Sequence, residues 1–133
     1  MERIVEVLKD VRDVPAWSMS SGETREAMVE ITRLNAAMAE LEARLVAHGR
    51  TAAVEAESGA TSTANWWAHT TKQTRAGAHR KTKLAAALTR DLHGPVRDAL
   101  ADGGLLVDQA EMIIAAPGHR APDLTRPGPP VGV

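Results

Sequence analysis

The chain contains no cysteine, phenylalanine or tyrosine among its 133 residues. The absence of cysteine excludes disulfides and zinc sites built from thiolates. Alanine supplies 24 residues, and three tryptophans are the only large aromatic side chains. A β-sandwich needs β-branched and aromatic residues, whereas alanine favours closely packed helices. Composition and length therefore predict a single all-α domain with a modest core.

Long apolar runs and catalytic motifs are also missing. No run is long enough to span a bilayer, and the charged N-terminus MERIVEVLKD lacks the apolar segment of a signal peptide. The five histidines show no metal-binding spacing such as HxxxH, and no phosphate loop, nucleophile elbow or carboxylate dyad is present. We therefore expect a cytoplasmic protein that is not an enzyme, has no membrane partner and holds neither metal nor cofactor.

Helical periodicity predicts about five or six helices, one of them long. Apolar residues at helical spacing indicate a first helix that ends before Pro15. Ser20 and Glu23 have the spacing of a capping box, which starts the long helix; it reaches about Glu57 if Gly49 does not break it. Its apolar residues at heptad spacing are Ile31, Leu34, Met38, Leu41 and Leu45. This seam covers only about two heptads, which favours an intramolecular core over a dimer.

Shorter helices follow the long one. We predict a helix capped by Ser62, a helix from Thr71 or Thr74 to about His93, a helix from Pro95 to Ala101, and a last helix from about Leu106 to Ala116. Gly94 fits the position after a helix end, and Pro95 fits a first helical turn. Residues 117–133 hold five of the seven prolines, so we expect a disordered tail after a helical domain at 1–116.

Three blocks of residues in the second half of the chain form a recognisable order. They are Ser62–Trp66; Thr74, Arg75, Ala76, Ala78, Arg80, Lys81, Lys83, Leu84, Ala85 and Leu88; and Ala99, Leu100, Gly103, Leu105, Asp108, Gln109, Ala110 and Ile113. This order resembles the actinobacterial domain of unknown function 222, also called the 13E12 repeat family. The resemblance covers roughly Thr24 to Ala116 and departs from the family's pattern at Trp67, Gly77 and Leu106, where the family's residues bear on how helices start.

The resemblance implies a helical region that usually precedes an HNH nuclease domain. An HNH site needs paired histidines near an asparagine, often with cysteine pairs around a structural zinc, and these motifs are absent here. The resemblance thus implies a non-catalytic accessory module, or a truncated relative of a longer nuclease. A nuclease role survives only if another chain supplies the active site.

The basic segment from Lys72 to Arg90 is the main candidate site. It holds six Lys or Arg and no acid, although the net charge of the chain is −1. The candidate nucleic-acid contacts are Arg75, His79, Arg80, Lys83 and Arg90. On one continuous helix, all of them except Arg80 would share a face that binds DNA phosphates without reading sequence. The alternative is a solvated face, or one that docks on the acidic long helix.

Two further features leave alternatives open. Trp66 and Trp67 lie about 100° apart on a helix, so one belongs to the core and one to its rim, or one anchors a partner or stacks on a base. The last two helices have a helix-turn-helix outline, but residues 98–116 hold four acids and no Lys or Arg, which favours packing over DNA reading. The alternative function is a protein-interaction module, which self-associates through the long helix or binds a partner at the Trp pair.

Overall fold

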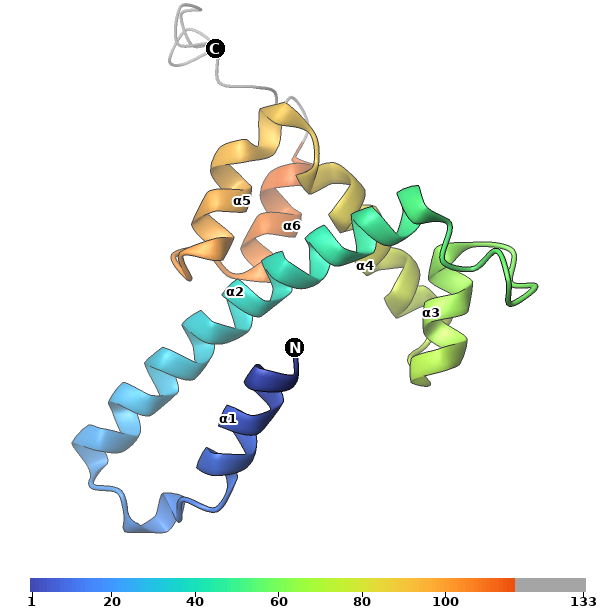
Figure 1. Ribbon diagram of the computed structural model, residues 1–133. Helices are drawn as coiled ribbons and strands as arrows, with labels where there is room; N and C mark the ends of the chain where they lie inside the picture. The colour runs from blue at the N-terminus through green and yellow to red at the C-terminus, as the bar shows by residue number, and fades with distance from the viewer. Residues whose placement is uncertain (117–133) are drawn as a thin grey trace, which may run out of the picture. The chain divides into compact units, whose positions relative to one another are not determined.

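The computed structural model describes residues 1–116, which are helical and contain no strand (Figure 1). The helices in this range are α1 (Glu2–Arg12), α2 (Ser21–Ala52), α3 (Thr63–Thr71), α4 (Arg75–Leu88), α5 (Gly94–Ala101) and α6 (Val107–Ala115). Two 3-10 turns, η1 (Ala16–Ser18) and η2 (Asp91–His93), join some of them. The all-α class and the single long helix are therefore confirmed. The predicted disordered tail, 117–133, lies outside the described residues.

The chain divides into two compact units, Met1–Thr32 and a second that begins at Arg33. The first unit consists of α1, η1 and the start of α2, and none of its residues is buried. Its exposed large apolar side chains are Met1, Ile4, Val5, Val7, Leu8, Val11, Val14, Trp17, Met28, Val29 and Ile31. The first unit thus has no hydrophobic core of its own, which is unusual for segments with this much apolar surface.

Local capping chemistry sets the starts of three helices. The Ser20 Oγ accepts from the Glu23 N–H at 3.1 Å, and the Ser20 N–H donates to the Glu23 carboxylate at 3.3 Å, which completes the predicted capping box of α2. Ser62 caps α3 by accepting from the Asn65 N–H at 3.1 Å. Thr74 caps α4 by accepting from the Gly77 N–H at 3.0 Å.

Alanine forms most of the core of the second unit. The buried cluster comprises Ala36, Ala43, Ala85, Leu88, Val96, Leu100 and Ala110, which come from α2, α4, α5 and α6. Leu100 is the only large side chain among the described residues that is completely buried. A second set of buried alanines, Ala64, Ala68 and Ala78, lies on α3 and α4, which pack against each other. Small side chains allow these helices to approach closely.

The helix that carries the basic segment is shorter than predicted. It begins at Arg75 because Lys72, with φ +65°, ends α3 in the left-handed region. It ends at Leu88, since the backbone becomes extended at Arg90. The Arg97 guanidinium donates to the Leu88 carbonyl at 2.7 Å and so satisfies a helix-end acceptor. Gly94 directly follows η2, which ends at His93, so it does come after a helix end as predicted; its φ and ψ are helical, and it is also the first residue of α5.

The long helix also ends earlier than its periodicity indicates. It stops at Ala52, because Ala53 adopts a positive φ of 53° and the chain turns back. Gly49 does not break the helix; it lies inside α2 and is buried. The Val54 and Thr63 side chains lie within 4 Å of the position that a Cβ on Gly49 would take. The turn after α2 therefore folds back against the last turns of the helix.

Candidate nucleic-acid interface

Helix α4 has one buried face and one charged face. Ala78, Thr82, Ala85 and Leu88 bury one side of the helix. The structure brings four of the five candidate contacts together on the exposed remainder of α4: Arg75, His79, Arg80 and Lys83. Arg90 is exposed as well, but it lies in the turn between α4 and η2. The predicted row along a single helix is therefore interrupted after Lys83.

The positive charge of this face is largely uncompensated. Among residues 1–116, the one cation of the basic segment with an acidic partner is Lys81, whose Nζ lies 4.0 Å from Glu42 of α2. Both side chains are about half exposed, at 45% and 43%, so water screens this pair and it contributes little stability. Arg75, Lys83 and Arg90 have no ion pair within the described range. The long acidic helix thus neutralises the basic helix only at Lys81.

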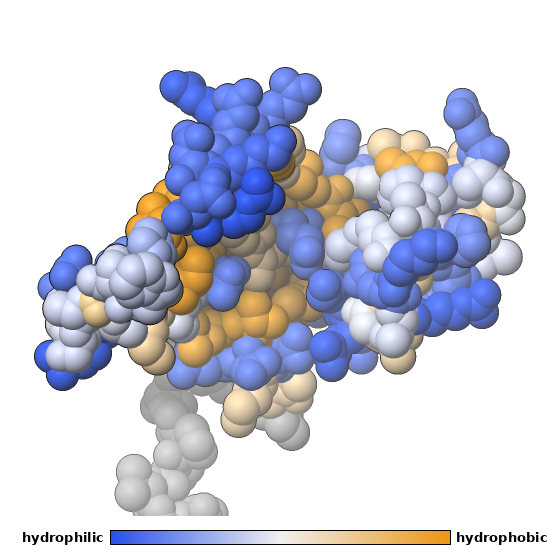
Figure 2. All heavy atoms as spheres, turned by 90° about the horizontal axis from the view of Figure 1, so that it is seen from below, coloured by the Kyte–Doolittle hydropathy of each residue, from blue (hydrophilic) through white to orange (hydrophobic). Residues whose placement is uncertain are grey.

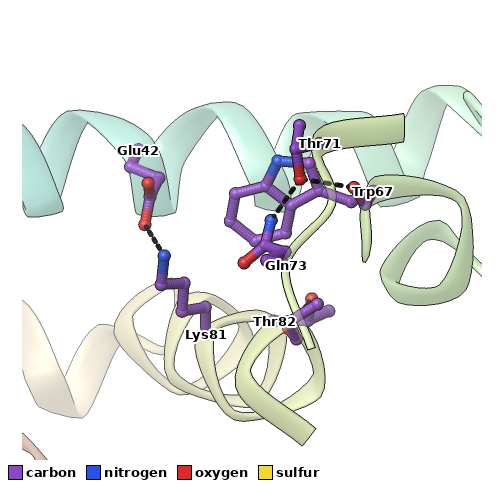
Figure 3. Close-up of polar contacts among 7 residues, drawn as sticks. Glu42, Trp67, Thr71, Gln73, Lys81 and Thr82 are labelled. Atoms are coloured by element: carbon purple, nitrogen blue, oxygen red, sulfur yellow. Dashed lines mark hydrogen bonds and ion pairs between the residues drawn. The ribbon is translucent and has the colours of Figure 1, made fainter. Parts of the chain in front are cut away.

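Lys81 also links the basic helix to the Trp pair. Its Nζ lies 5.4 Å from the centre of the Trp67 ring, within the range of a cation–π interaction. Figure 3 shows Lys81 reaching toward Glu42, with the Trp67 ring beside Gln73 and Thr71. The Thr71 hydroxyl donates to the Trp67 carbonyl at 2.6 Å and accepts from the Gln73 amide at 2.9 Å. Sequence reasoning did not select Lys81, because its partners come from two distant helices.

The tryptophans of the Trp pair, Trp66 and Trp67, are both half-buried. The structure therefore differs from either predicted arrangement: neither ring belongs to the fully buried core, and neither is among the exposed large apolar side chains. Trp66 and Trp67 are both partly exposed on α3, whereas Ala64 and Ala68 of the same helix are buried. Their position leaves only part of each ring available to a partner.

His79 joins the charged face to α3. Its Nε2 lies 2.9 Å from the Asn65 Oδ1, and the Asn65 amide nitrogen donates to the Thr61 hydroxyl at 2.6 Å. Because the Asn65 Oδ1 can only accept, His79 must donate from Nε2. His79 therefore positions α3 against α4 while its side chain stays exposed.

An acidic element borders one side of the charged face. A recess of about 300 Å³ lies among α2, α4 and α6. Its lining includes Arg80 and Lys81 from α4, Glu42 from α2, and Asp108 and Glu111 from α6. A phosphate that approached Arg80 from this side would meet three carboxylates. The side of α4 that carries Arg75 and Lys83 has no such neighbours in the recess, so it is the better phosphate surface.

The helix pair α5 and α6 packs into the core of the second unit. Val96, Leu100 and Ala110 are buried, and Gly103 between the helices has a φ of +75°. The acids Asp98, Asp102 and Asp108 are exposed. This arrangement agrees with the predicted packing role for the helix-turn-helix outline, because the pair presents negative charge to solvent.

Two other kinds of feature are absent from the described part of the chain. Residues 1–116 contain no group of three or more His, Asp or Glu side chains that could hold a metal ion. None of the helices in this range is long and apolar enough to cross a membrane.

No protein family, curated protein or solved structure matches the chain. The resemblance to the 13E12 repeat family stays a prediction. A functional conclusion therefore depends on the geometry of α4 and the residues around it.

Proposed function

We propose that the chain is a non-catalytic module that binds nucleic acid through phosphate contacts made by α4 and the turn after it. The observation that carries the proposal is the set of exposed cations without ion pairs: Arg75, Lys83 and Arg90. Arginine and lysine in this state bind phosphate and release condensed counterions, which supplies nearly all of non-specific DNA affinity. Arg80 and His79 would add contacts at the edges of the same surface.

The spacing on α4 suits a phosphate backbone. Arg75 and Lys83 are separated by eight residues, or about 12 Å along the helix axis. This distance corresponds to the rise of roughly three or four base-pair steps along the duplex axis. The neighbouring residue Ala76 is exposed and offers no hydrogen-bonding group to base edges. We therefore expect affinity without sequence preference, with a dissociation constant of roughly micromolar or weaker at physiological salt.

The family resemblance supports the same function, since this helical region usually accompanies an HNH nuclease domain in its relatives. A partner-binding role for the Trp pair has weaker support. Both rings are half-buried, and the Lys81 ammonium already lies over Trp67. Self-association through α2 is compatible with the proposal, because the exposed apolar seam of α2 and the charged face of α4 use different residues.

Charge reversal on α4 tests the proposal directly. The triple variant Arg75→Glu, Lys83→Glu, Arg90→Glu should lose binding to a fluorescent duplex at low salt, because its phosphate contacts become repulsive. The matched control, Arg3→Glu, Lys9→Glu, Arg25→Glu, makes the same change in net charge at exposed positions of the first unit. Circular dichroism should report unchanged helix content for both variants.

The control separates local contact from bulk charge. The control variant should retain measurable binding under conditions in which the α4 variant has none. Equal loss in the two variants would mean that net charge alone governs the affinity. No binding by the wild type at low salt, or full binding by the α4 variant, would refute a phosphate surface on α4.

A further inference from the structure

Helix α2 has apolar residues on two opposite faces. Ala36, Glu40 and Ala43 are buried on one face, where α2 contributes to the core of the second unit. At about 100° per residue, the heptad seam points in nearly the opposite direction. Four seam residues are exposed to similar extents: Ile31 at 51%, Leu34 at 48%, Met38 at 39% and Leu45 at 51%.

The seam therefore does not form the intramolecular core that the sequence favours. None of its residues belongs to the buried cluster, and Leu41 is only half-buried. Met28, at 63% exposed, extends the apolar strip toward the start of α2. Figure 2 shows large apolar areas at the surface of the molecule between charged side chains. A helix that is apolar on both faces is normally covered on both.

We propose that a second copy of this chain covers the seam, with the two α2 helices antiparallel. Residues 24–45 span about 32 Å along the helix. The large apolar side chains of this strip and the polar residues on its rim would bury on the order of several hundred Å² per copy, the range of small specific interfaces. The area is sufficient for a dimer without any contribution from α1.

The charged residues beside the seam favour an antiparallel orientation of the two α2 helices. When Ile31 of one copy packs against Leu34 of the other, Ala27 faces Met38 of the other copy. In that register Glu23 lies beside Arg44 of the second copy, and two-fold symmetry repeats the pair. In a parallel dimer, Glu23 would flank Met28 and Arg44 would flank Gly49, so no opposite charges would meet.

Arg44 has free capacity for this contact. Its Nε binds the buried Glu40 carboxylate at 2.9–3.0 Å, while its side chain remains 62% exposed. A guanidinium has five N–H donors, and the pairing with Glu40 uses only the Nε–H. Glu40 therefore holds Arg44 at the border of the seam, with its terminal nitrogens available to Glu23 of the second copy.

Oligomeric state is the first test. Light scattering after size exclusion, without nucleic acid, should give twice the chain mass at tens of micromolar. The variant Ile31→Gln, Leu34→Gln keeps net charge and helix propensity but should give the mass of one chain. The control Val29→Gln changes an exposed apolar residue on the opposite side of α2 and should remain dimeric. A monomeric wild type at several hundred micromolar, or a dimeric double variant, would overturn the proposal.

Cross-linking tests the orientation of the two α2 helices. It does not require the Ile31→Gln, Leu34→Gln variant to fold. Because the chain has no cysteine, each introduced thiol is unique. A mixture of Ala27→Cys and Met38→Cys chains should form a disulfide-linked dimer on mild oxidation, whereas each variant alone should link at least ten times more slowly. Efficient linking of Ala27→Cys alone would indicate a parallel pair and refute the antiparallel dimer. Failure of the mixture to link above the single-variant level would refute it as well.

Discussion

Gly49 and Gly103 are both buried, but a side chain could be added at Gly49 and not at Gly103. Gly103 has a φ of +75°, and a Cβ there would lie 2.8 Å from the Arg33 Cβ and 3.1 Å from the Arg33 carbonyl oxygen. Gly49 is inside α2, and a Cβ there would meet the Val54 side chain at an ordinary 3.6 Å. Only the turn glycine is required by its conformation and its close neighbour.

Alanine substitutions should therefore change stability in opposite directions. Gly103→Ala should lower the free energy of unfolding by more than about 1 kcal/mol, because it adds backbone strain and a clash with Arg33. Gly49→Ala should raise it by up to about 1 kcal/mol, since alanine is the better helix former and finds space. Urea unfolding followed by circular dichroism measures both. A Gly103→Ala chain as stable as wild type would contradict the geometry of the turn.

The Glu40–Arg44 pair gives a second test at the level of single residues. Glu40 is only 4% exposed, so its carboxylate depends on Arg44 for compensation. Arg44→Met should destabilise the chain by about 1–3 kcal/mol, because a buried carboxylate loses its partner. The double variant Glu40→Met, Arg44→Met should recover most of that loss, since no buried charge remains. Equal instability of the single and double variants would show that packing, not charge, makes the pair important.

At the scale of elements, α4 depends on small residues where it meets other helices. Ala78 is completely buried on the side of α4 that packs near α3, whereas Ala76 is exposed. Ala78→Leu should cost about 1–3 kcal/mol, because extra methylene groups force the helices apart. Ala76→Leu adds the same atoms on the solvent side and should change the free energy of unfolding by less than about 0.5 kcal/mol. Thermal or urea unfolding distinguishes the two variants.

Helix starts were predictable from the sequence because their causes are local. Ser20, Ser62 and Thr74 each accept a hydrogen bond from an N–H three residues later, a spacing that can be read directly. The end of α4 was not predictable, because the Arg97 guanidinium reaches back to the Leu88 carbonyl from another helix. Arg90 therefore lies outside the helix on which the sequence placed it. The tertiary contact at the end of α4 cannot be read from helical periodicity.

The candidate site was only partly predictable for the same reason. The run of cations is visible in the sequence, and its position on α4 follows from helical spacing for Arg75, His79 and Lys83. Whether those charges are neutralised depends on α2 and α6, which are distant in sequence. Only the structure places Glu42 beside Lys81, and Asp108 and Glu111 in the recess next to Arg80.

At the scale of the whole molecule, the net charge of −1 conceals the separation of charge. DNA binding by a local cluster depends on the number of phosphates it meets, not on net charge. With three contacts per copy from Arg75, Lys83 and Arg90, the log–log slope of affinity against salt should be about −2.7 for an isolated copy. Fluorescence anisotropy at several salt concentrations measures this slope. A flat dependence would exclude phosphate contacts as the source of affinity.

A dimer would change that dependence in a measurable way, because it presents two charged α4 faces to one duplex. The dimer-breaking variant Ile31→Gln, Leu34→Gln leaves Arg75, Lys83 and Arg90 unchanged, so the affinity of each copy for a duplex too short for two copies should equal that of wild type. On a longer duplex, wild type should bind about tenfold or more tightly than the variant, because the second contact becomes intramolecular. On that longer duplex, the log–log slope of wild-type affinity against salt should approach twice the slope of the variant. Equal slopes on the longer duplex would mean that the two charged faces of a dimer do not engage the same DNA together, even if each binds phosphate alone.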